Sequence, residues 1–375
     1  MVFDRRTDRF AGAGLYDPDS PIRIRVLHAG RPVRVDAAFF AGVVTRAHGL
    51  RAPLLATDTN AYRLLNGEND GTPGLIADVY AGVLVVKAYT RAWAPWLGLV
   101  VDALTGVSGA ETVVLRLSRA VQRVGRPPAP ASDAAATGAP AAAWGDGVVL
   151  RGALPEPEVV FREHGVRLRA NVLAGHKTGF FLDHRENRRR VGAACAKTRH
   201  TAPATVLDVF SYAGGFAAHA LVGGAREVTA LDVSRQALEL ARENARLNLA
   251  EPPLRTIAGD AFVELEALGR TGRRFDVVVV DPPSFAKRAR EVAGALRAYR
   301  RLTRLAVPLV APGGLLLLAS CSARVAAEDF YALQAEELRR SGRRFTEVDQ
   351  TGHDVDHPVG FAEGAYLKTW YVRVG

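Results

Sequence analysis

Acidic residues stand at the ends of successive apolar runs in the C-terminal half of the chain. Asp232 closes one run, where a carboxylate can accept hydrogen bonds from both ribose hydroxyls of an adenosine ligand. Asp260 follows the next run and can contact an adenine amino group. The competing role for Asp232 is to cap the helix that follows, although Ser234 can fill that role instead. Taken together, these acids predict a binding site for an adenosine-containing ligand.

A pair of glycines follows an earlier run, within LDVFSYAGGF at residues 207–216. Glycine lets the backbone approach a ligand closely, and the helix expected next directs the positive end of its dipole toward that ligand. Tight packing of a strand against a helix explains such a pair equally well. The spacing is not G-x-G-x-x-G, which disfavours a dinucleotide bound through its pyrophosphate.

Two further run ends carry residues suited to chemistry on a planar base. Asp281 is followed by Pro282 and Pro283, which fix φ and stiffen the turn, so that the acid can hold a base by its edge. A buried acid in an ordinary turn is the alternative. Cys321 follows another run, and a cysteine in such a place is usually an inert small hydrophobe. Its position beside the predicted pocket makes its thiolate a candidate nucleophile.

The segment GHKTGFFLDHRENRRR, at residues 175–190, precedes the first of these runs. Its phenylalanines can cover a heterocycle, and Lys177 and the arginines can contact phosphates. The arginine run is equally compatible with a solvated helix face. His176 and His184 have no partners at metal-binding spacing, so we predict no metal site.

The elements that must position these residues follow from the apolar runs. The runs occupy residues 205–210, 227–232, 254–258, 275–281 and 314–320, and 365–372 adds a closing strand. Because the runs alternate with amphipathic helices, the sequence predicts an α/β fold with a mostly parallel sheet covered by helices on both faces. Ligands of such sheets bind beyond the carboxyl ends of the strands, where the acids and the cysteine stand.

The chain before residue 173 predicts different elements. Residues 1–33 suggest short β-strands, and 34–172 a separate α+β domain ahead of the sheet domain at 173–375. The predicted elements of the α+β domain are a helix through Phe39, a turn at 67–71, a hairpin of 75–80 and 83–89, a helix at 93–104, a strand at 112–117 and a hairpin of 159–162 and 166–171. Residues 125–147, rich in Pro, Ala and Gly, lack the side chains to bury a core and predict a flexible loop.

Composition limits the class of protein. The 375 residues are 48% hydrophobic, enough for two or three domains with buried cores. A formal net charge of +10 fits an acidic partner such as nucleic acid, or simply a general preference for arginine. Two cysteines are too few for a disulfide framework or a metal cluster and favour a reducing cytoplasm. The N-terminus has no secretory apolar segment, and no stretch is apolar enough to span a membrane.

Several motifs, in order and spacing, resemble one family. They are GHKTGFFLDHRENRRRV, VLDVFSYAGGFAAHAL, ALDVS, FDVVVVDPPSFAK and SCS, with YRLLNGENDGTPGLIADVY and DHPVGFAEGAYLK as further similar segments. They resemble the bacterial 23S ribosomal RNA 5-methylcytosine methyltransferases of the PUA-containing large-subunit methyltransferase I type. The resemblance covers nearly the whole chain. It implies a Rossmann-like class I methyltransferase sheet with an antiparallel last strand, S-adenosylmethionine as cofactor and S-adenosylhomocysteine as product.

The resemblance also implies roles for single residues. The implied cofactor site consists of Phe181, Asp183, Arg185, Asp208, Ser211, Gly214, Asp232, Ser234, Asp260 and Asp281. The residues expected to contact RNA are Lys177, Arg188, Arg189 and Lys287. Cys321 corresponds to the cysteine that attacks C6 of cytosine, and Asp281, protonated or sharing a proton, would hold N3. The expected partner is ribosomal RNA, and a homodimer stays open.

One departure concerns the N-terminus. Members of the family usually begin with a complete PUA domain, whereas residues 1–33 resemble only its last part. Alternatives also stay open. A guanine-nitrogen methyltransferase of ribosomal RNA would share the sheet but would not need Cys321. A catalytically silent RNA-binding relative would have lost cofactor binding. A nicotinamide-dependent oxidoreductase is disfavoured by the missing glycine pattern.

Overall fold

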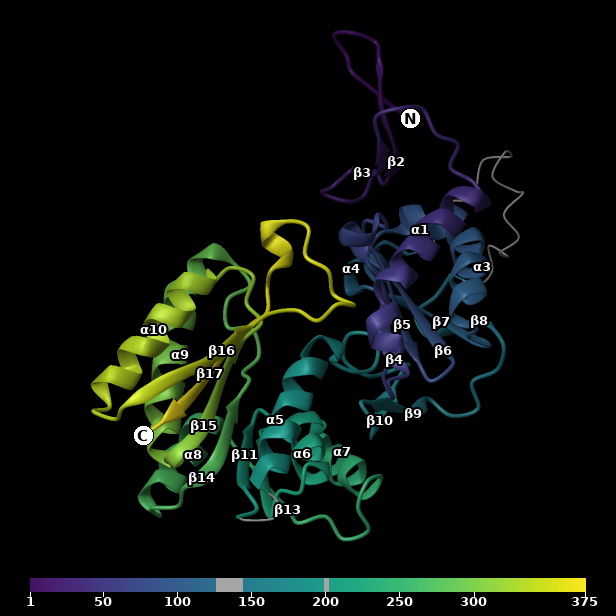
Figure 1. Cartoon of the computed structure of the whole chain (residues 1–375). Helices are drawn as coiled ribbons and strands as arrows, with labels where there is room; N and C mark the ends of the chain where they lie inside the picture. Colours follow the sequence, from purple (N-terminus) through teal and green to yellow (C-terminus); the bar gives the residue numbers. More distant parts are fainter. Residues whose placement is uncertain (126–143, 199–201) are drawn as a thin grey trace. The chain divides into compact units, whose positions relative to one another are not determined.

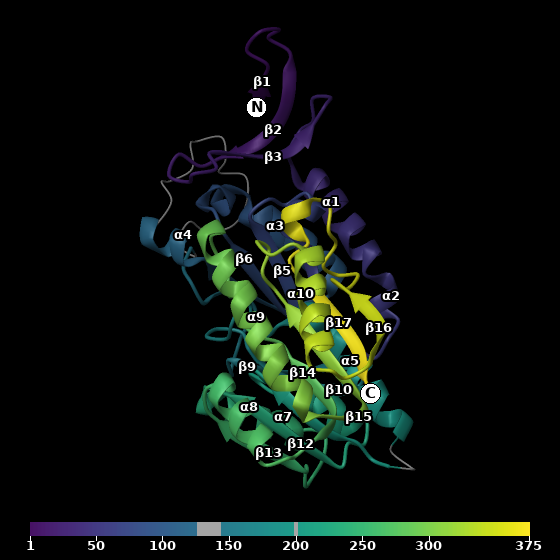
Figure 2. The same cartoon turned by 90° about the vertical axis from the view of Figure 1, so that its left-hand side faces the viewer.

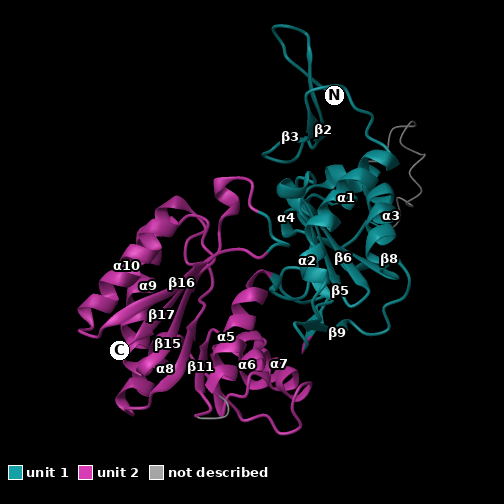
Figure 3. Cartoon of the chain, viewed as in Figure 1, with its two compact units in different colours: residues 1–165, 169–182, 355–358 teal, residues 166–168, 183–354, 359–375 magenta. Residues whose placement is uncertain are grey.

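The computed structural model describes residues 1–125, 144–198 and 202–375 (Figure 1). The chain divides into two compact units (Figure 3). Unit 1 comprises residues 1–165, 169–182 and 355–358, and unit 2 comprises residues 166–168, 183–354 and 359–375. The flexible loop predicted at residues 125–147 lies mostly outside the described residues.

Unit 2 is built on a seven-stranded sheet with the order β13-β12-β11-β14-β15-β17-β16. Its strands are β11 (Thr205–Val209), β12 (Glu227–Asp232), β13 (Leu254–Ala258), β14 (Phe275–Val280), β15 (Val310–Ser320), β16 (Phe345–Thr351) and β17 (Lys368–Val374). Strands β11 to β15 pair in parallel, and β17 runs antiparallel to both of its neighbours. The predicted mostly parallel sheet with an antiparallel last strand is confirmed. Strand β16 was not predicted.

Helices cover both faces of this sheet, as predicted. They are α5 (Arg185–Thr198), α6 (Gly215–Val222), α7 (Arg235–Arg246), α8 (Ala261–Arg270), α9 (Val292–Ala306) and α10 (Ala327–Arg340). Helices α5, α6 and α7 share one apolar core, whereas α8, α9 and α10 share the other (Figure 2 looks onto α9 and α10). Neighbouring residues of one strand enter different cores, as Val277 and Val278 do. Burial on both faces explains why these strands appear in the sequence as continuous apolar runs.

Unit 1 contains a five-stranded sheet with the order β4-β5-β6-β7-β8. Its strands are β4 (Ala61–Asn66), β5 (Leu75–Tyr80), β6 (Val83–Ala88), β7 (Thr112–Leu117) and β8 (Val148–Arg151). The accompanying helices are α1 (Ala37–Leu50), α2 (Ala52–Leu55), α3 (Leu97–Ser108) and α4 (Arg119–Val124). Strands β1 (Val2–Phe3), β2 (Phe10–Tyr16) and β3 (Ile24–Ala29) form a separate small sheet.

Short elements complete the chain. The predicted hairpin at 159–171 is present as β9 (Glu158–Glu163) and β10 (Val166–Asn171). The 3-10 helices are η1 (Gly67–Asp70), η2 (Arg91–Trp96), η5 (Leu182–His184), η6 (Ala289–Glu291), η7 (Val307–Leu309) and η8 (Ala362–Gly364). The turn predicted at 67–71 is therefore η1, and the helix predicted at 93–104 is split into η2 and α3. Among the described residues, no helix is both long and apolar enough to cross a membrane.

Candidate active site in unit 2

The loop between β11 and α6 contains residues with positive φ values. Phe210 and Tyr212 have φ values of 64° and 49°, and Gly214 has a φ of 71°. A Cβ added to Gly214 would stand 2.7 Å from the Cβ of Ala241 on α7. Gly214 is therefore required both by its conformation and by close packing of this loop against α7.

Asp208 holds this loop through hydrogen bonds. Its buried carboxylate accepts hydrogen bonds from the Ser211 hydroxyl at 2.7 Å and the Ala217 backbone N–H at 3.2 Å. Burial, reinforced by the charges of Asp281 and Asp232, raises the pKa of Asp208 to about 7. Asp208 and Ser211, both predicted to bind cofactor, are thus hydrogen-bonded to each other, and the Asp208 carboxylate is covered by the loop.

Asp232 joins the end of β12 to the same loop. One carboxylate oxygen accepts from the Tyr212 N–H and the other from the Ser234 N–H, both at 2.9 Å. Ser234 itself caps α7, since its hydroxyl accepts from the Ala237 N–H at 3.2 Å. The capping role considered for Asp232 therefore falls to Ser234. Val233 between them is 77% exposed, which places an apolar side chain next to a carboxylate at the end of the strand.

Asp260 begins the next helix. Its Oδ1 accepts from the N–H groups of Phe262 at 2.9 Å and Val263 at 3.2 Å, so that it is the N-cap of α8. The residue is exposed, and the Val263 side chain beside it is also largely exposed. Asp260 thus combines a structural role with an accessible carboxylate.

Asp281 faces a histidine that the sequence did not mark as functional. The Nε2 atom of His184 lies 3.2 Å from Oδ1 of Asp281. On the other side of the ring, Nδ1 lies 3.1 Å from the Asn187 side-chain Nδ2. The Asn187 oxygen accepts from the hydroxyls of Thr351 and Tyr371, both at 2.7 Å, which makes Nδ2 the donor to His184. The remaining ring hydrogen is therefore on Nε2, on the side of the ring that faces Asp281.

Cys321 stands immediately after β15 and beside the turn that Asp281 begins. Its Sγ is 3.9 Å from the carbonyl oxygen of Pro282, and the residue is partly exposed. The Tyr299 hydroxyl lies 2.8 Å from the Ser320 hydroxyl and 3.3 Å from that of Ser322. The fold thus brings together the thiol and the Asp281-Pro282 turn, which were predicted separately.

The predicted residues at the start of α5 are mostly buried. Asp183 accepts a hydrogen bond from the Tyr366 hydroxyl at 2.8 Å, and fully buried Arg185 forms an ion pair with Asp354 at 2.6 Å. Arg188 is only 3% exposed, so its guanidinium is not displayed for an RNA phosphate in this structure. By contrast, Arg189 is exposed and pairs with Glu186 on its own helix, and Lys287 is also exposed.

Phe181 and Lys177 belong to unit 1 and contact each other there. The Lys177 ammonium lies 4.9 Å from the centre of the Phe181 ring, and the His176 ring stacks on the same phenylalanine at 5.9 Å. Thr178 between them donates a hydrogen bond to Asp78, which also forms a buried ion pair with Arg63. Buried polar contacts therefore fix the backbone that carries both residues.

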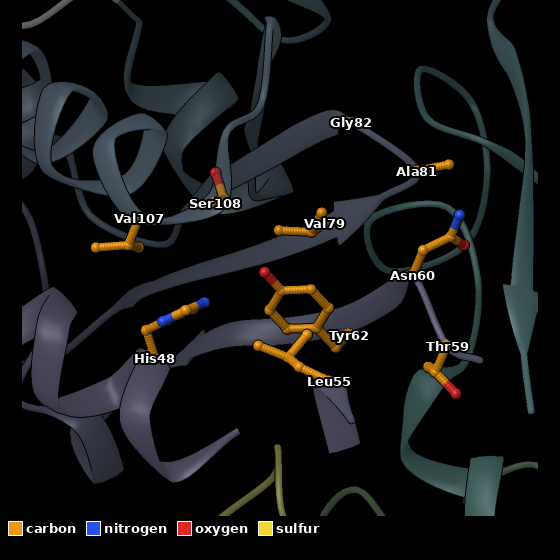
Figure 4. Close-up of a pocket in the computed structure, with 10 residues that line it drawn as sticks. All are labelled: His48, Leu55, Thr59, Asn60, Tyr62, Val79, Ala81, Gly82, Val107 and Ser108. Carbon is orange, nitrogen blue, oxygen red and sulfur yellow. The ribbon is translucent and has the colours of Figure 1, made fainter. Parts of the chain in front are cut away.

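A separate hollow of about 330 Å³ lies in unit 1 (Figure 4). Its lining comes from α1, α3 and the strand ends near Asn60 and Ala81, and includes the Tyr62 ring. None of the predicted site residues lines it. Within the described ranges, no group of three His, Cys, Asp or Glu side chains is placed to hold a metal ion.

Comparison with known proteins identifies the family. A family model for S-adenosylmethionine-dependent methyltransferases matches residues 146–361. The ribosomal RNA large subunit methyltransferase of Deinococcus radiodurans is 45% identical, over 100% of this chain and 88% of that protein. Ribosomal RNA large subunit methyltransferase I of Klebsiella pneumoniae is 34% identical, over 98% of this chain and 87% of that protein. The chain belongs to this family of methyltransferases. The resemblance stated from the motifs is confirmed.

Solved structures agree on the fold of this methyltransferase. A Streptococcus mutans protein described as an S-adenosylmethionine-dependent methyltransferase has a TM-score of 0.78 at 20% identity, over 99% of this chain and 90% of that one. A methyltransferase in complex with S-adenosylhomocysteine has a TM-score of 0.79 at 21% identity, with the same coverage. Likenesses at this identity concern the fold alone.

The strand ends of the methyltransferase fit S-adenosylmethionine chemically. The ribose hydroxyls and the adenine amino group of this cofactor are hydrogen-bond donors, and Asp232 and Asp260 present acceptors for them. Exposed Val233 and Val263 offer apolar surface for a flat ring. The donor and acceptor types of this site therefore match the cofactor that the family uses.

Proposed function

We propose that this methyltransferase modifies C5 of a cytosine in ribosomal RNA, within the 23S molecule, and that Cys321 is its nucleophile. The observation that carries the proposal is the approach of the Cys321 Sγ to within 3.9 Å of the Pro282 carbonyl oxygen. It places a partly exposed thiol beside the Asp281-Pro282-Pro283 turn, which is suited to holding a base by its edge. The names of the two relatives, both ribosomal RNA large subunit methyltransferases, support the substrate class.

The chemistry explains why a thiol is needed. Carbon C5 of cytosine is a poor nucleophile until the Cys321 thiolate adds at C6 and forms an Sγ–C6 bond, which makes C5 part of an enamine. Bound S-adenosylmethionine would supply an electrophilic methyl group for the new bond to C5, with S-adenosylhomocysteine as the leaving group. Loss of the C5 proton to a base then lets the Sγ–C6 bond break, and the thiolate is regenerated. The target nucleotide must leave its stack, at a cost of roughly a few kcal/mol.

Asp281 serves to orient the base in this proposal. Its carboxylate, protonated or sharing a proton, holds N3 and stabilises the charge that develops in the ring when sulfur adds. The His184 Nε2 hydrogen lies on the Asp281 side of the ring and is suited to sharing a proton with Oδ1. His184 thereby joins the site as a residue that positions Asp281.

The remaining assignments follow the site contacts. For the cofactor we assign direct contacts to Asp232 and Asp260, whereas Asp208 and Ser211 hold the loop that faces it. Asp183 and Arg185 support the site indirectly, Asp183 through its hydrogen bond with Tyr366 and Arg185 through its ion pair with Asp354. For RNA we favour exposed Arg189 and Lys287 over buried Arg188. A cytoplasmic location and a homodimer stay predictions, as does the absence of a metal.

A covalent trap tests this proposal. RNA containing 5-fluorocytidine at the target cannot lose a proton from C5, so that the Sγ–C6 bond persists after methylation. The wild-type protein should form a denaturant-resistant adduct that requires S-adenosylmethionine, and Cys321→Ala should form none. An adduct in Cys321→Ala would show that another residue is the nucleophile. Methylguanosine as the product on ordinary RNA, with no adduct in the wild type, would favour the guanine-nitrogen alternative.

A further inference from the structure

Lys368 occupies a buried position next to the proposed nucleophile. It is the first residue of β17 and pairs with Ser320 of β15 in the antiparallel register, one residue before Cys321. Its side chain belongs to a residue that is only 3% exposed. Lysine is rarely buried to this degree, because its ammonium loses hydration that only strong partners replace.

The ammonium of Lys368 holds the turn that follows Cys321. Nζ donates to the carbonyl oxygens of Ser322 at 2.6 Å and Val325 at 2.8 Å. The Val325 N–H in turn donates to the Ser322 carbonyl oxygen at 3.2 Å. The Lys368 ammonium therefore bridges two carbonyl groups of the turn at residues 322–325. This turn directly follows Cys321 in the chain.

The charge of Lys368 has no carboxylate partner in the part of the chain that the structure describes. Two carbonyl dipoles replace hydration but do not neutralise a cation. Accordingly, burial lowers the pKa of Lys368 to about 8, while negative charge on Cys321 acts in the opposite direction and favours the ammonium. Such coupling is mutual, so a cationic Lys368 must favour the Cys321 thiolate to the same extent.

Other titratable groups also act on this pair. The hydroxyl of Tyr299 on α9 contacts the hydroxyls of Ser320 and Ser322. Burial raises the pKa of Tyr299, and the negative charges of Cys321 and Asp281 act in the same direction. Neither Tyr299 nor Asp281 can carry a positive charge, so neither can stabilise a thiolate by charge. The ammonium of Lys368 has the sign that is required to stabilise a thiolate at Cys321.

We propose that Lys368 is a positioning residue for Cys321, whose buried ammonium stabilises the thiolate and fixes the turn that presents it. The proposal rests on the proposed function of Cys321 as nucleophile. The thiol loses its proton to water, which reaches the partly exposed sulfur. The thiolate charge then pairs electrostatically with the ammonium until sulfur adds to the base.

The test measures the pH profile of Cys321 alkylation by iodoacetamide. Cys195, which is buried on α5, is first replaced by alanine so that all alkylation occurs at Cys321. Lys368→Met should raise the apparent thiol pKa by about one unit and slow alkylation at pH 7 about tenfold. Lys368→Arg should retain most of the wild-type reactivity because it keeps the charge. Lys87→Met is the matched control, since Lys87 is a half-buried lysine of unit 1 that also donates to a backbone carbonyl, that of Lys177.

A second variant guards against simple unfolding. Lys368→Gln can still donate to one carbonyl but has no charge, and it should reproduce the pKa change with S-adenosylhomocysteine affinity within about twofold of wild type. A thiol profile that is the same in wild type, Lys368→Met and Lys368→Gln would overturn the proposal. The alkylation profile measures the reactivity of the thiol and needs no methyl transfer. Failure of the Lys368 proposal is therefore distinguishable from failure of the proposed function, which the activity of Cys321→Ala tests.

Discussion

The imidazole of His184 and the carboxylate of Asp281 face each other with 3.2 Å between Nε2 and Oδ1. Asn187 fixes the ring from the opposite side, and Asn187 is itself fixed by Thr351 on β16 and Tyr371 on β17. A chain of hydrogen bonds therefore runs from the antiparallel edge of the sheet to the His184 ring, which lies beside the acid that is proposed to hold the base. Such a chain restricts the rotation of the His184 ring beside Asp281.

His184→Ala should lower kcat for RNA methylation by about tenfold to a hundredfold, because Asp281 loses its fixed neighbour. The affinity for S-adenosylhomocysteine should stay within about twofold. His184→Gln should recover a large part of the activity, since its side-chain amide can place an N–H near Asp281. Steady-state kinetics on 23S RNA fragments measure all three values, and an unchanged kcat in His184→Ala would remove the residue from the site.

Asp232→Ala should weaken S-adenosylhomocysteine binding by more than about tenfold, as expected for loss of charge-assisted hydrogen bonds. Asp232 also holds the Tyr212 and Ser234 N–H groups, so part of the loss will come from the loop. Asp232→Asn, which keeps an acceptor for these groups, should lie between wild type and alanine. Calorimetric titration gives the affinities, and thermal unfolding checks that the protein stays folded. Equal affinity in all three proteins would show that Asp232 does not contact the cofactor.

Strands could be predicted from the sequence where buried apolar residues are bounded by polar or turn-forming residues. Strand β12 (Glu227–Asp232) was predicted with its observed bounds because its interior residues are buried on both faces and polar residues delimit it. Strand β16 (Phe345–Thr351) was missed because it is an edge strand with mostly polar, exposed residues. Strand β4 (Ala61–Asn66) was missed because Arg63 interrupts its apolar run, and only folding supplies the Asp78 partner that allows this charge to be buried.

The same limit applies to the site. The acids and Cys321 could be predicted because each follows a recognisable strand. The contact of His184 with Asp281 could not, because it joins segments that are distant in the sequence and a lone histidine carries no periodic pattern. The burial of Arg188 was equally hidden, since Arg188, Arg189 and Arg190 look alike in sequence and only the packed helix makes them differ.

Asp208→Asn should become relatively more stable than wild type as the pH rises. Burial raises the pKa of Asp208 in the folded protein to about 7, well above its value in the unfolded chain. Its stabilising contribution is therefore fully present only below the unfolded pKa and is lost as the pH rises through 7. Asparagine keeps an acceptor for Ser211 and Ala217 without acquiring charge. Urea unfolding at pH 5.5 and pH 8 should show a change in the stability difference of about 1–2 kcal/mol in favour of the variant. A difference that does not depend on pH would contradict the raised pKa.

Arg189→Ala and Lys287→Ala should each weaken RNA binding and reduce the salt dependence of the binding constant, since both side chains are exposed. The slope of log K against log salt should fall by about 0.7 to 1 for each lost phosphate contact. Arg270→Ala is a matched control, because Arg270 is an exposed helical arginine that pairs with Glu266, much as Arg189 pairs with Glu186. Filter binding across a salt series gives these slopes. Equal slopes for Arg189→Ala, Lys287→Ala and the control would place the RNA elsewhere.

The most direct test of the account is nucleoside mass spectrometry of unmodified bacterial 23S RNA after incubation with labelled S-adenosylmethionine. The wild-type protein should form labelled 5-methylcytidine and Cys321→Ala should form none, although the variant should bind S-adenosylhomocysteine within about twofold of wild type. Labelled 5-methylcytidine formed by Cys321→Ala at the wild-type rate, or a methylated guanosine formed by the wild type, would contradict it.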